Sequence, residues 1–410
     1  MRRQLLIGAL LLFLASLIVF YYGSRFKVLV ARAQGGPPDD YLDAYASYQF
    51  NNLNHPTGLV LIRPNRPDQG DAYFYLFIAD SGNHVIRQFT STLGTLDTVA
   101  GTLGSPGYVD GTNAKFNYPT GLSGYSTTWS ECTCGGSCPR SCYTYYDYQN
   151  LYINDSQNYA VRQVCVGSPD PSNPDACNTD VTTSLHPVQT VSGTAAQPGY
   201  VDGPSLSATF DSLAGYTAGT PNYLADAGNH AIRAWDGVSV STFAGTGSYG
   251  YVDGYRTNAQ FNSPTKLTQD SSGMMYIADA GNNAIRRVDT AGNVTTLAGA
   301  GPNNPGLVDG QGSAASFFLP TSVVFNPADG YIYVADSHNN CIRRIDSAGN
   351  VSTYAGTGQP GLVNGPLLQA QFDKPADLVI WNGYMYISDS LNNVIRRIDM
   401  VNQQASTYIG

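Results

Sequence analysis

The chain has 410 residues, including 44 glycines, 23 prolines and 29 tyrosines, and only 12% of its residues are charged. Glycine and proline favour turns and tyrosine favours strands, so this composition predicts an all-β protein and argues against a mostly helical one. The formal net charge of −9 at pH 7 gives no basic excess for binding phosphates, which argues against nucleic acid as a partner.

The N-terminus carries an uncharged apolar run, residues 5–22, behind the basic pair Arg2 and Arg3. We expect an apolar helix here, and at about 1.5 Å per residue it would just cross a bilayer core. Residues 1–22 fit either a retained signal-anchor or a cleaved signal peptide. In either case we expect the rest of the chain to be secreted or at the cell surface, touching the membrane only through this segment. Residues 23–40 follow as a linker.

A repeat organises the rest of the chain. The pattern Asp-x-x-Asn-x-x-x-Arg occurs six times, and the last four copies are 53 to 57 residues apart. Each unit contains four short strand patterns separated by turn residues. Because a lone four-stranded sheet of this kind leaves apolar faces uncovered, six units predict a closed ring of six blades. The repeated aspartates are Asp80, Asp155, Asp226, Asp279, Asp336 and Asp389.

A second motif, Val-Asp-Gly followed by a phenylalanine, lies between the units, as in Asp253 and Phe261. We expect it to carry the chain from the outermost strand of one blade to the innermost strand of the next, with the phenylalanine packed between blades. A degenerate copy, Asp43 with Phe50, precedes the first unit. The propeller is therefore predicted to cover residues 41–410.

The unit that contains Tyr276, Asp279, Asn282 and Arg286 resembles an NHL repeat, and the resemblance extends over residues 56–410. It implies a six-bladed NHL β-propeller. Some NHL-like propellers are lyases that hold zinc by histidines in the channel. The resemblance therefore leaves a metal-dependent lyase or hydrolase, with its site at the central channel, as the alternative to a binding scaffold.

The repeated aspartates and arginines are assigned to folding, because a residue present in every blade is one that a blade needs. Three histidines, His84, His230 and His338, lie in the same turn of the repeat. His338 has a different offset from its aspartate, so we do not expect the three to converge on zinc. The sequence assigns no catalytic residue, no metal ligand and no cofactor, and an enzyme is the less favoured hypothesis.

The second unit contains an insertion, at about residues 130–178, that does not follow the repeat. Its cysteines are predicted to form disulfide bonds in an oxidising compartment, with the pairing left open. Its tyrosines are candidate partner-binding residues, because tyrosine is enriched at interfaces. Cys341, outside the insertion, is expected to be a buried apolar residue. The cysteines are Cys132, Cys134, Cys138, Cys142, Cys165 and Cys177, and the tyrosines are Tyr143, Tyr145, Tyr146 and Tyr148.

Three sequons predict N-glycosylation, at Asn293 and Asn350 in equivalent hairpin turns and at Asn154 within a strand, where access is poorer. Together these features predict an extracytoplasmic scaffold that binds protein or glycan partners. Self-assembly, as a component of the cell surface or of a filament, is a further hypothesis.

Overall fold

The computed structural model describes residues 17–22, 25–30, 52–64, 73–132, 143–167, 186–194, 196–217, 219 and 221–410. Residues 1–50 and 51–410 form two separate compact units. In the first unit, β1 (Leu17–Tyr22) pairs antiparallel with β2 (Arg25–Val30). β1 covers the last residues of the predicted apolar segment, and residues 5–16 of that segment lie outside the described residues, so the apolar helix stays a prediction. The described part of the chain contains no helix long and apolar enough to span a membrane.

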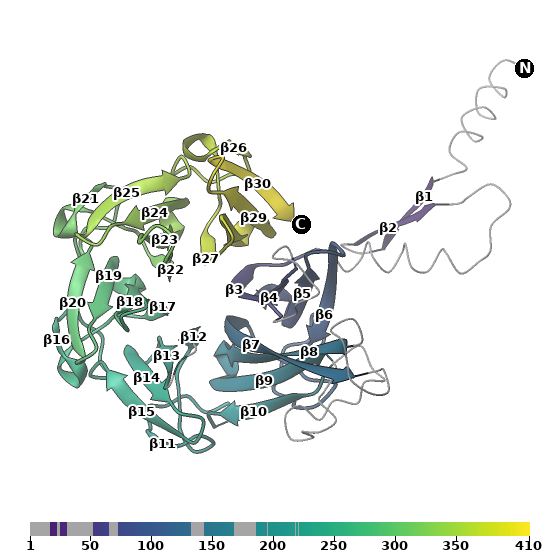
Figure 1. Cartoon of the computed structure of the whole chain (residues 1–410), viewed down its shortest axis with the longest axis horizontal. Helices are drawn as coiled ribbons and strands as arrows, with labels where there is room; N and C mark the ends of the chain where they lie inside the picture. The colour runs from purple at the N-terminus through teal and green to yellow at the C-terminus, as the bar shows by residue number, and fades with distance from the viewer. Residues whose placement is uncertain are drawn as a thin grey trace, which may run out of the picture. The chain divides into compact units, whose positions relative to one another are not determined.

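The second unit is a ring of six antiparallel sheets around a central channel, which confirms the predicted six-bladed propeller (Figure 1). Each sheet takes its four main strands from one continuous stretch of chain, ordered from the channel outwards. Blade 1 is β3 (Pro56–Ile62), β4 (Tyr75–Asp80), β5 (Val85–Thr90) and β6 (Thr95–Ala100), and blade 2 is β7 (Pro119–Cys132), β8 (Tyr143–Asp155), β9 (Ala160–Gly167) and β10 (Val188–Ser192).

The remaining four blades follow the same plan. Blade 3 is β12 (Leu213–Thr217), β13 (Asn222–Asp226), β14 (Ala231–Trp235) and β15 (Ser239–Ala244), and blade 4 is β17 (Pro264–Gln269), β18 (Met275–Asp279), β19 (Ala284–Val288) and β20 (Asn293–Ala298). Blade 5 is β22 (Pro320–Phe325), β23 (Ile332–Asp336), β24 (Cys341–Ile345) and β25 (Asn350–Ala355), and blade 6 is β27 (Pro375–Trp381), β28 (Tyr384–Asp389), β29 (Val394–Asp399) and β30 (Gln404–Ile409).

The Val-Asp-Gly motif connects the blades as predicted. In blades 3 to 6 it leads into a two-residue strand that pairs with the outermost strand of the blade it enters, as β16 (Gly254–Tyr255) pairs with β20. The other three are β11 (Gly203–Pro204), β21 (Gly310–Gln311) and β26 (Gly365–Pro366). The phenylalanine that follows is fully buried, and Phe116, for example, packs with Ile86 of blade 1 and Leu122 of blade 2. Each such side chain therefore holds two neighbouring blades together.

Blade 1 corrects one detail of the sequence prediction. In every other unit the buried apolar side chain lies three residues before the start of the innermost strand, and in blade 1 that residue is Leu53, which is only 4% exposed. Leu53 packs with Leu59 of blade 1 and with Tyr386 and Ile395 of blade 6. Phe50, which was predicted for this role, lies outside the described residues.

Among the described strands, the ring closes without strand exchange. The chain enters blade 1 at β3 and ends in blade 6 at β30, and each of these blades is complete in itself. Five junctions between blades are therefore crossed by the chain. The sixth, between blades 6 and 1, is held by non-covalent contacts alone.

Candidate functional site

In blades 2 to 6 the repeated Asp, Asn and Arg residues form one network, seen clearly in blade 4. The Asp279 carboxylate is buried and accepts hydrogen bonds from the Asn262 amide at 2.7 Å, from Asn282 Nδ2 at 2.8 Å and from Arg286 Nη1 at 2.8 Å. Arg286 Nη2 donates to Asp253 Oδ1 at 2.7 Å. Asp253 belongs to the Val-Asp-Gly motif, so the network joins the two motifs of the repeat.

Burial raises the pKa of Asp279 to about 6, while the neighbouring Arg286 and the amide donors lower it in part. The Arg286 guanidinium carbon lies 5.2 Å from the centroids of both Tyr251 and Phe261. A fully buried cation between two aromatic rings, paired with carboxylates on both sides, is satisfied within the protein. These residues therefore have the structural role in the blade that the sequence analysis assigned to them.

Two of the predicted histidines link blades. Each has a positive φ at the end of a short 3₁₀ turn, and its Nδ1 accepts a backbone N–H from the next blade: Tyr118 to His84 at 3.2 Å and Ser263 to His230 at 3.0 Å. In blades 4, 5 and 6 an asparagine Oδ1 makes the same bond. Those asparagines are Asn283, Asn340 and Asn393. His84 and His230 are therefore variants of a structural position.

No group of three or more His, Cys, Asp or Glu side chains placed to hold a metal ion occurs within the described ranges. Burial lowers the pKa of His84, His230 and His338, which favours neutral rings. We assign no metal-binding role to these histidines.

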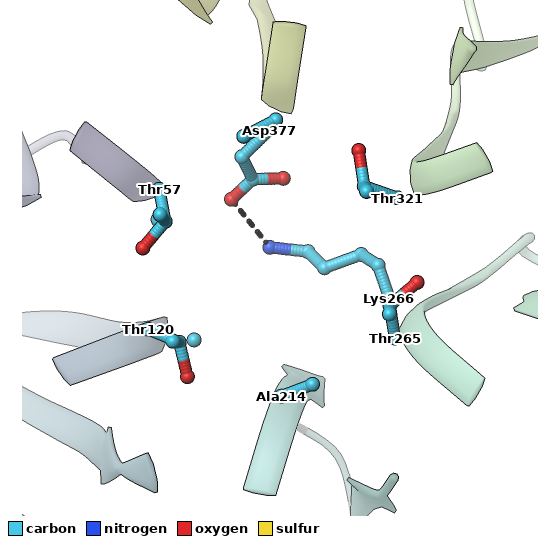
Figure 2. A pocket seen from close by; sticks show the side chains of 10 residues that line it. Thr57, Thr120, Ala214, Thr265, Lys266, Thr321 and Asp377 are labelled. Atoms are coloured by element: carbon cyan, nitrogen blue, oxygen red, sulfur yellow. Dashed lines mark hydrogen bonds and ion pairs between the residues drawn. The ribbon is translucent and has the colours of Figure 1, made fainter. Parts of the chain in front are cut away.

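The central channel is lined by the first residues of the six innermost strands (Figure 2). Four of these strands place a threonine there, and its hydroxyl donates to a carbonyl at the start of the next blade's innermost strand, as Thr120 donates to Leu213 O at 2.9 Å and Thr321 to Pro375 O at 3.2 Å. Ala214 and Ala376 occupy this position in the other two blades. The threonine hydroxyls form a second set of links between blades.

An ion pair crosses the channel. Lys266 of β17 extends toward Asp377 of β27, and Lys266 Nζ lies 2.9 Å from Asp377 Oδ2 (Figure 2). The two side chains are 15% and 4% exposed. The pair thus joins blade 4 to blade 6 in a setting that is largely shielded from water.

Asp377 also connects three further groups. Its Oδ2 accepts the backbone N–H of Leu59 in blade 1 at 2.8 Å, and its Oδ1 accepts the hydroxyl of Ser322 in blade 5 at 2.7 Å and its neighbouring Leu378 N–H at 2.9 Å. One carboxylate therefore ties blade 6 to blades 1, 4 and 5. It lies beside the junction that the chain does not cross.

Sequence reasoning missed Lys266, Ser322 and Asp377, although a signal was present. These residues stand at the third position of the innermost strand, where blades 1 to 3 have glycine. A Cβ atom on Gly58 would lie 1.7 Å from Thr120 O, so the neighbouring strand leaves no room for a side chain there. In blades 4, 5 and 6 this position carries a side chain instead, and in blades 4 and 6 that side chain is charged.

The cavity at this position has a volume of about 180 Å³. Pockets for drug-sized ligands usually measure about 300–1,000 Å³. Both oxygens of Asp377 are already hydrogen-bonded, so neither is free to act on a substrate. Lys266 and Asp377 therefore form a structural contact that helps to close the ring of blades.

The insertion predicted in blade 2 is partly described. β7 and β8 pair continuously from Pro119 and Asp155 to Cys132 and Tyr143. Cys165 lies in β9, and the other predicted disulfide cysteines, Cys134, Cys138, Cys142 and Cys177, lie outside the described residues. Their disulfide bonds therefore stay a prediction. Cys341 is a free, buried cysteine.

The three sequons differ in exposure. Asn293 and Asn350 are exposed at the first positions of β20 and β25, and their glycosylation stays a prediction. Asn154 in β8 is fully buried, and neither of its side-chain polar atoms has a hydrogen-bond partner among the described residues. This burial disfavours Asn154 as a glycosylation site, because its amide nitrogen is inaccessible in the folded blade.

Comparison with known proteins gives the same architecture. The chain is 29% identical over 354 residues to SUPPRESSOR OF QUENCHING 1 of Arabidopsis thaliana, which covers 79% of this chain and 29% of that protein. It is 26% identical over 367 residues to NHL repeat-containing protein 2 of Gallus gallus, covering 79% of this chain and 45% of that protein. The chain is an NHL-type β-propeller. No family model matches it.

Solved structures show the same fold for the NHL-type propeller at low sequence identity. A putative phosphatase from Bacteroides thetaiotaomicron superposes with a TM-score of 0.53 at 15% identity, over 87% of this chain and 71% of that one. An auxiliary nutrient binding protein from Bacteroides ovatus gives 0.50 at 16% identity, over 87% and 70%. The NHL-type propeller spans less than half the length of the sequence relatives named above.

Proposed function

We propose that this NHL-type propeller is an extracytoplasmic binding scaffold that engages a protein or glycan partner through the hairpin of blade 2. The observation that carries the proposal is the length of β7 and β8. They have 14 and 13 residues, whereas the innermost strands of the other blades have 5 to 7. No folding requirement of a blade explains this extension.

The extension runs from the pair Tyr125 and Asn150 to the pair Cys132 and Tyr143. At about 3.3 Å per residue it projects roughly 23 Å. The candidate tyrosines are part of its second strand, and Tyr146 is paired with Trp129. A two-stranded ribbon rich in aromatic residues offers a large contact area with few rotatable bonds, which suits recognition of a partner.

The location outside the cytoplasm rests on the N-terminal apolar run, the clustered cysteines and the sequons at Asn293 and Asn350. Disulfide bonds and N-glycans both belong to secreted or cell-surface proteins. We propose that residues 1–22 serve as a signal-anchor or signal peptide and residues 23–40 as a linker. A mass shift of the purified protein on glycosidase treatment would support this location, and an unmodified chain with six free thiols in the insertion would contradict it.

The experiment that tests the hairpin is a pull-down with a trimmed variant. Blade 6 joins Trp381 to Tyr384 by Asn382 and Gly383, both with positive φ, which is a tight hairpin turn. Replacing residues 126–149 by Asn-Gly would join Tyr125 to Asn150 in the same way and leave the blade intact.

The full chain should capture a defined partner that the trimmed variant fails to capture, while both unfold at the same urea concentration. A matched variant with serine at Tyr143, Tyr145, Tyr146 and Tyr148 separates the tyrosines from the cysteine loop. Light scattering of both forms would detect self-association through the hairpin. Equal capture by the full and trimmed chains would overturn the proposal.

A further inference from the structure

A second cavity lies on the outer side of the ring, at the seam between blades 2 and 3, and has a volume of about 600 Å³. Its lining comes from β8, β9 and β10 of blade 2, from β13 and the β14–β15 hairpin of blade 3, and from the segment that follows β11. This volume is within the range of about 300–1,000 Å³ that ligand pockets occupy. We refer to it as the seam cavity.

Aromatic rings form one wall of the seam cavity. The rings of Tyr152 and Trp235 are nearly perpendicular, at 85°, with centroids 5.4 Å apart, and Tyr152 stacks on Tyr216 at 5.6 Å. Trp235 Nε1 donates to Ser205 Oγ at 2.9 Å, so the one polar atom of the indole is satisfied within the protein. Because Trp235 is only 3% exposed, the apolar surface that this wall offers to a ligand comes mainly from the half-buried Tyr152 ring.

The seam cavity does not arise from the repeat itself. Trp235 stands where blades 4, 5 and 6 have the smaller residues Val288, Ile345 and Ile398. The loop between β14 and β15 is also shorter than its counterpart between β19 and β20, with residues 236–238 in place of 289–292. These departures are confined to the cavity, which points to a role beyond folding.

Two aliphatic side chains flank the seam cavity and are largely in water: Leu206 is 64% exposed and Val238 is 77% exposed. The only charged residue in the lining is Asp236. Its Oδ1 accepts the Val238 and Ser239 N–H groups at 2.8 and 2.7 Å, and these bonds lower its pKa, which keeps the carboxylate ionised. Its Oδ2 accepts only the Ser239 hydroxyl, at 3.2 Å, among the described residues.

The amides of the lining are already used. Gln163 Nε2 donates to Asn150 Oδ1 at 2.6 Å and its Oε1 accepts from Gln189 at 2.9 Å, while Asn222 bonds to the Trp235 carbonyl and the Gly219 N–H. A glycan would need several free donors and acceptors for its hydroxyls. The Asp236 carboxylate and the aliphatic surface of Leu206 and Val238 remain available to a ligand. They match a ligand that has an apolar group next to a cation.

We propose that the seam cavity binds a short segment of a partner protein, with an apolar side chain inserted beside Leu206 and Val238 and an adjacent lysine or arginine paired with Asp236. This site rests on the proposed role as a binding scaffold, but it uses a different surface from the blade 2 hairpin. The partner is thus defined by an apolar residue next to a basic one, in an extended or turn conformation that reaches a lateral seam.

The test uses a displayed library of random 12-residue peptides, selected on the purified full-length protein and then measured individually by fluorescence polarisation. The variant L206S/V238S removes the aliphatic flanks without touching the core, because both side chains are exposed. The variant Asp236→Asn removes the charge. Blade 6 supplies matched controls at its own hairpin: Val401→Ser, at a residue 80% exposed, and Asp399→Asn, whose carboxylate accepts the equivalent backbone N–H groups.

We expect selected peptides to share an apolar residue beside lysine or arginine. L206S/V238S should weaken their binding by about 30-fold and Asp236→Asn by about fivefold, the latter loss shrinking at high salt, with both blade 6 controls unchanged. Peptides that bind L206S/V238S as well as the parent chain, or a selection that yields no peptide, would overturn the proposal. Binding of a neutral glycan that depends on Leu206 and Val238 would show that the ligand of the seam cavity is a glycan and not a peptide.

The hairpin-trimmed variant keeps the two proposals distinguishable. Peptides that occupy the seam cavity should bind the trimmed and full chains equally. If trimming abolishes both partner capture and peptide binding, the peptides occupy the hairpin and the seam proposal fails. If the seam peptides are absent while partner capture still depends on the hairpin, only the seam proposal is lost.

Discussion

Replacing Asp377 by alanine is expected to weaken the junction between blades 6 and 1 more than any other junction. The carboxylate accepts the Leu59 N–H across that junction, the Ser322 hydroxyl and the Lys266 ammonium. Alanine leaves all three donors without this partner in a site where Asp377 is only 3% exposed. The contacts that remain across the junction include apolar packing around Leu53, the bond from His55 N to Asn393 Oδ1 at 2.8 Å and the bond between His55 Nδ1 and Ser390 Oγ at 3.2 Å.

The magnitude follows from the groups that are left behind. Removing one partner of a buried ion pair typically costs about 3–5 kcal/mol, because the other charge remains without compensation. Since Lys266 is 15% exposed and can draw in water, the lower end, about 3 kcal/mol, is expected for Asp377→Ala. Lys266→Met alone should cost less, about 1–2 kcal/mol, because Asp377 keeps its three other donors. In the double variant Lys266→Met/Asp377→Ala no buried lysine charge is left without a partner. The double variant should therefore lose less stability than the sum of the losses of the two single variants.

Urea unfolding of the four proteins of this cycle, followed by circular dichroism, measures the coupling. Amide hydrogen exchange locates the effect: in Asp377→Ala the N–H of Leu59 and its neighbours in β3 should exchange faster, while β14 and β19 should be unchanged. Thr120→Ala is the matched control, because it removes an interblade hydrogen bond at a junction that the chain crosses. It should cost about 1 kcal/mol. A cost below 1 kcal/mol for Asp377→Ala, or uniform exchange around the ring, would refute closure by Asp377.

Two further outcomes are expected. Burial lowers the pKa of His84 and His230 below the usual 6.5, so their contribution to stability is complete above that pH and is lost as pH falls through the folded-state pKa. A variant with asparagine at both positions should therefore be as stable as the parent chain at pH 7.5. At pH 5.5 it should lose less stability than the parent chain, as measured by urea titrations at the two pH values. Phe261→Ala should cost about 3–5 kcal/mol, measured the same way, because the ring is fully buried between blades.

The repeated part of the fold was predictable from sequence because every blade imposes the same requirement. Asp279 and Arg286 occur at one spacing in each unit since a buried carboxylate and guanidinium must satisfy each other. The same logic would have identified Leu53, because it lies at the fixed distance from Pro56. Searching for phenylalanine instead of for that position led to Phe50.

The non-repeated part was harder to predict for a physical reason. Lys266 and Asp377 are far apart in sequence and meet only because the ring brings blades 4 and 6 across one channel. Trp235 can be recognised as a departure from Val288 and Ile345, but a cavity depends on what the neighbouring blade places beside it. Tyr152, which supplies that wall, occupies an ordinary position of the repeat.

Closure without strand exchange explains why the unique charged pair lies where it does. At five junctions the connecting chain keeps neighbouring blades together even when their contacts open transiently, so single hydrogen bonds made by threonine, histidine or asparagine side chains are sufficient there. At the junction between blades 6 and 1, an opened contact is not restrained by a connecting segment, and loop-closure entropy must be overcome to restore it. Opening of this junction breaks the bond from Leu59 N–H to Asp377, and the bonds from Ser322, Leu378 and Lys266 hold the Asp377 carboxylate in position to re-form it. The departure from glycine at Asp377 is therefore the counterpart of the missing strand exchange.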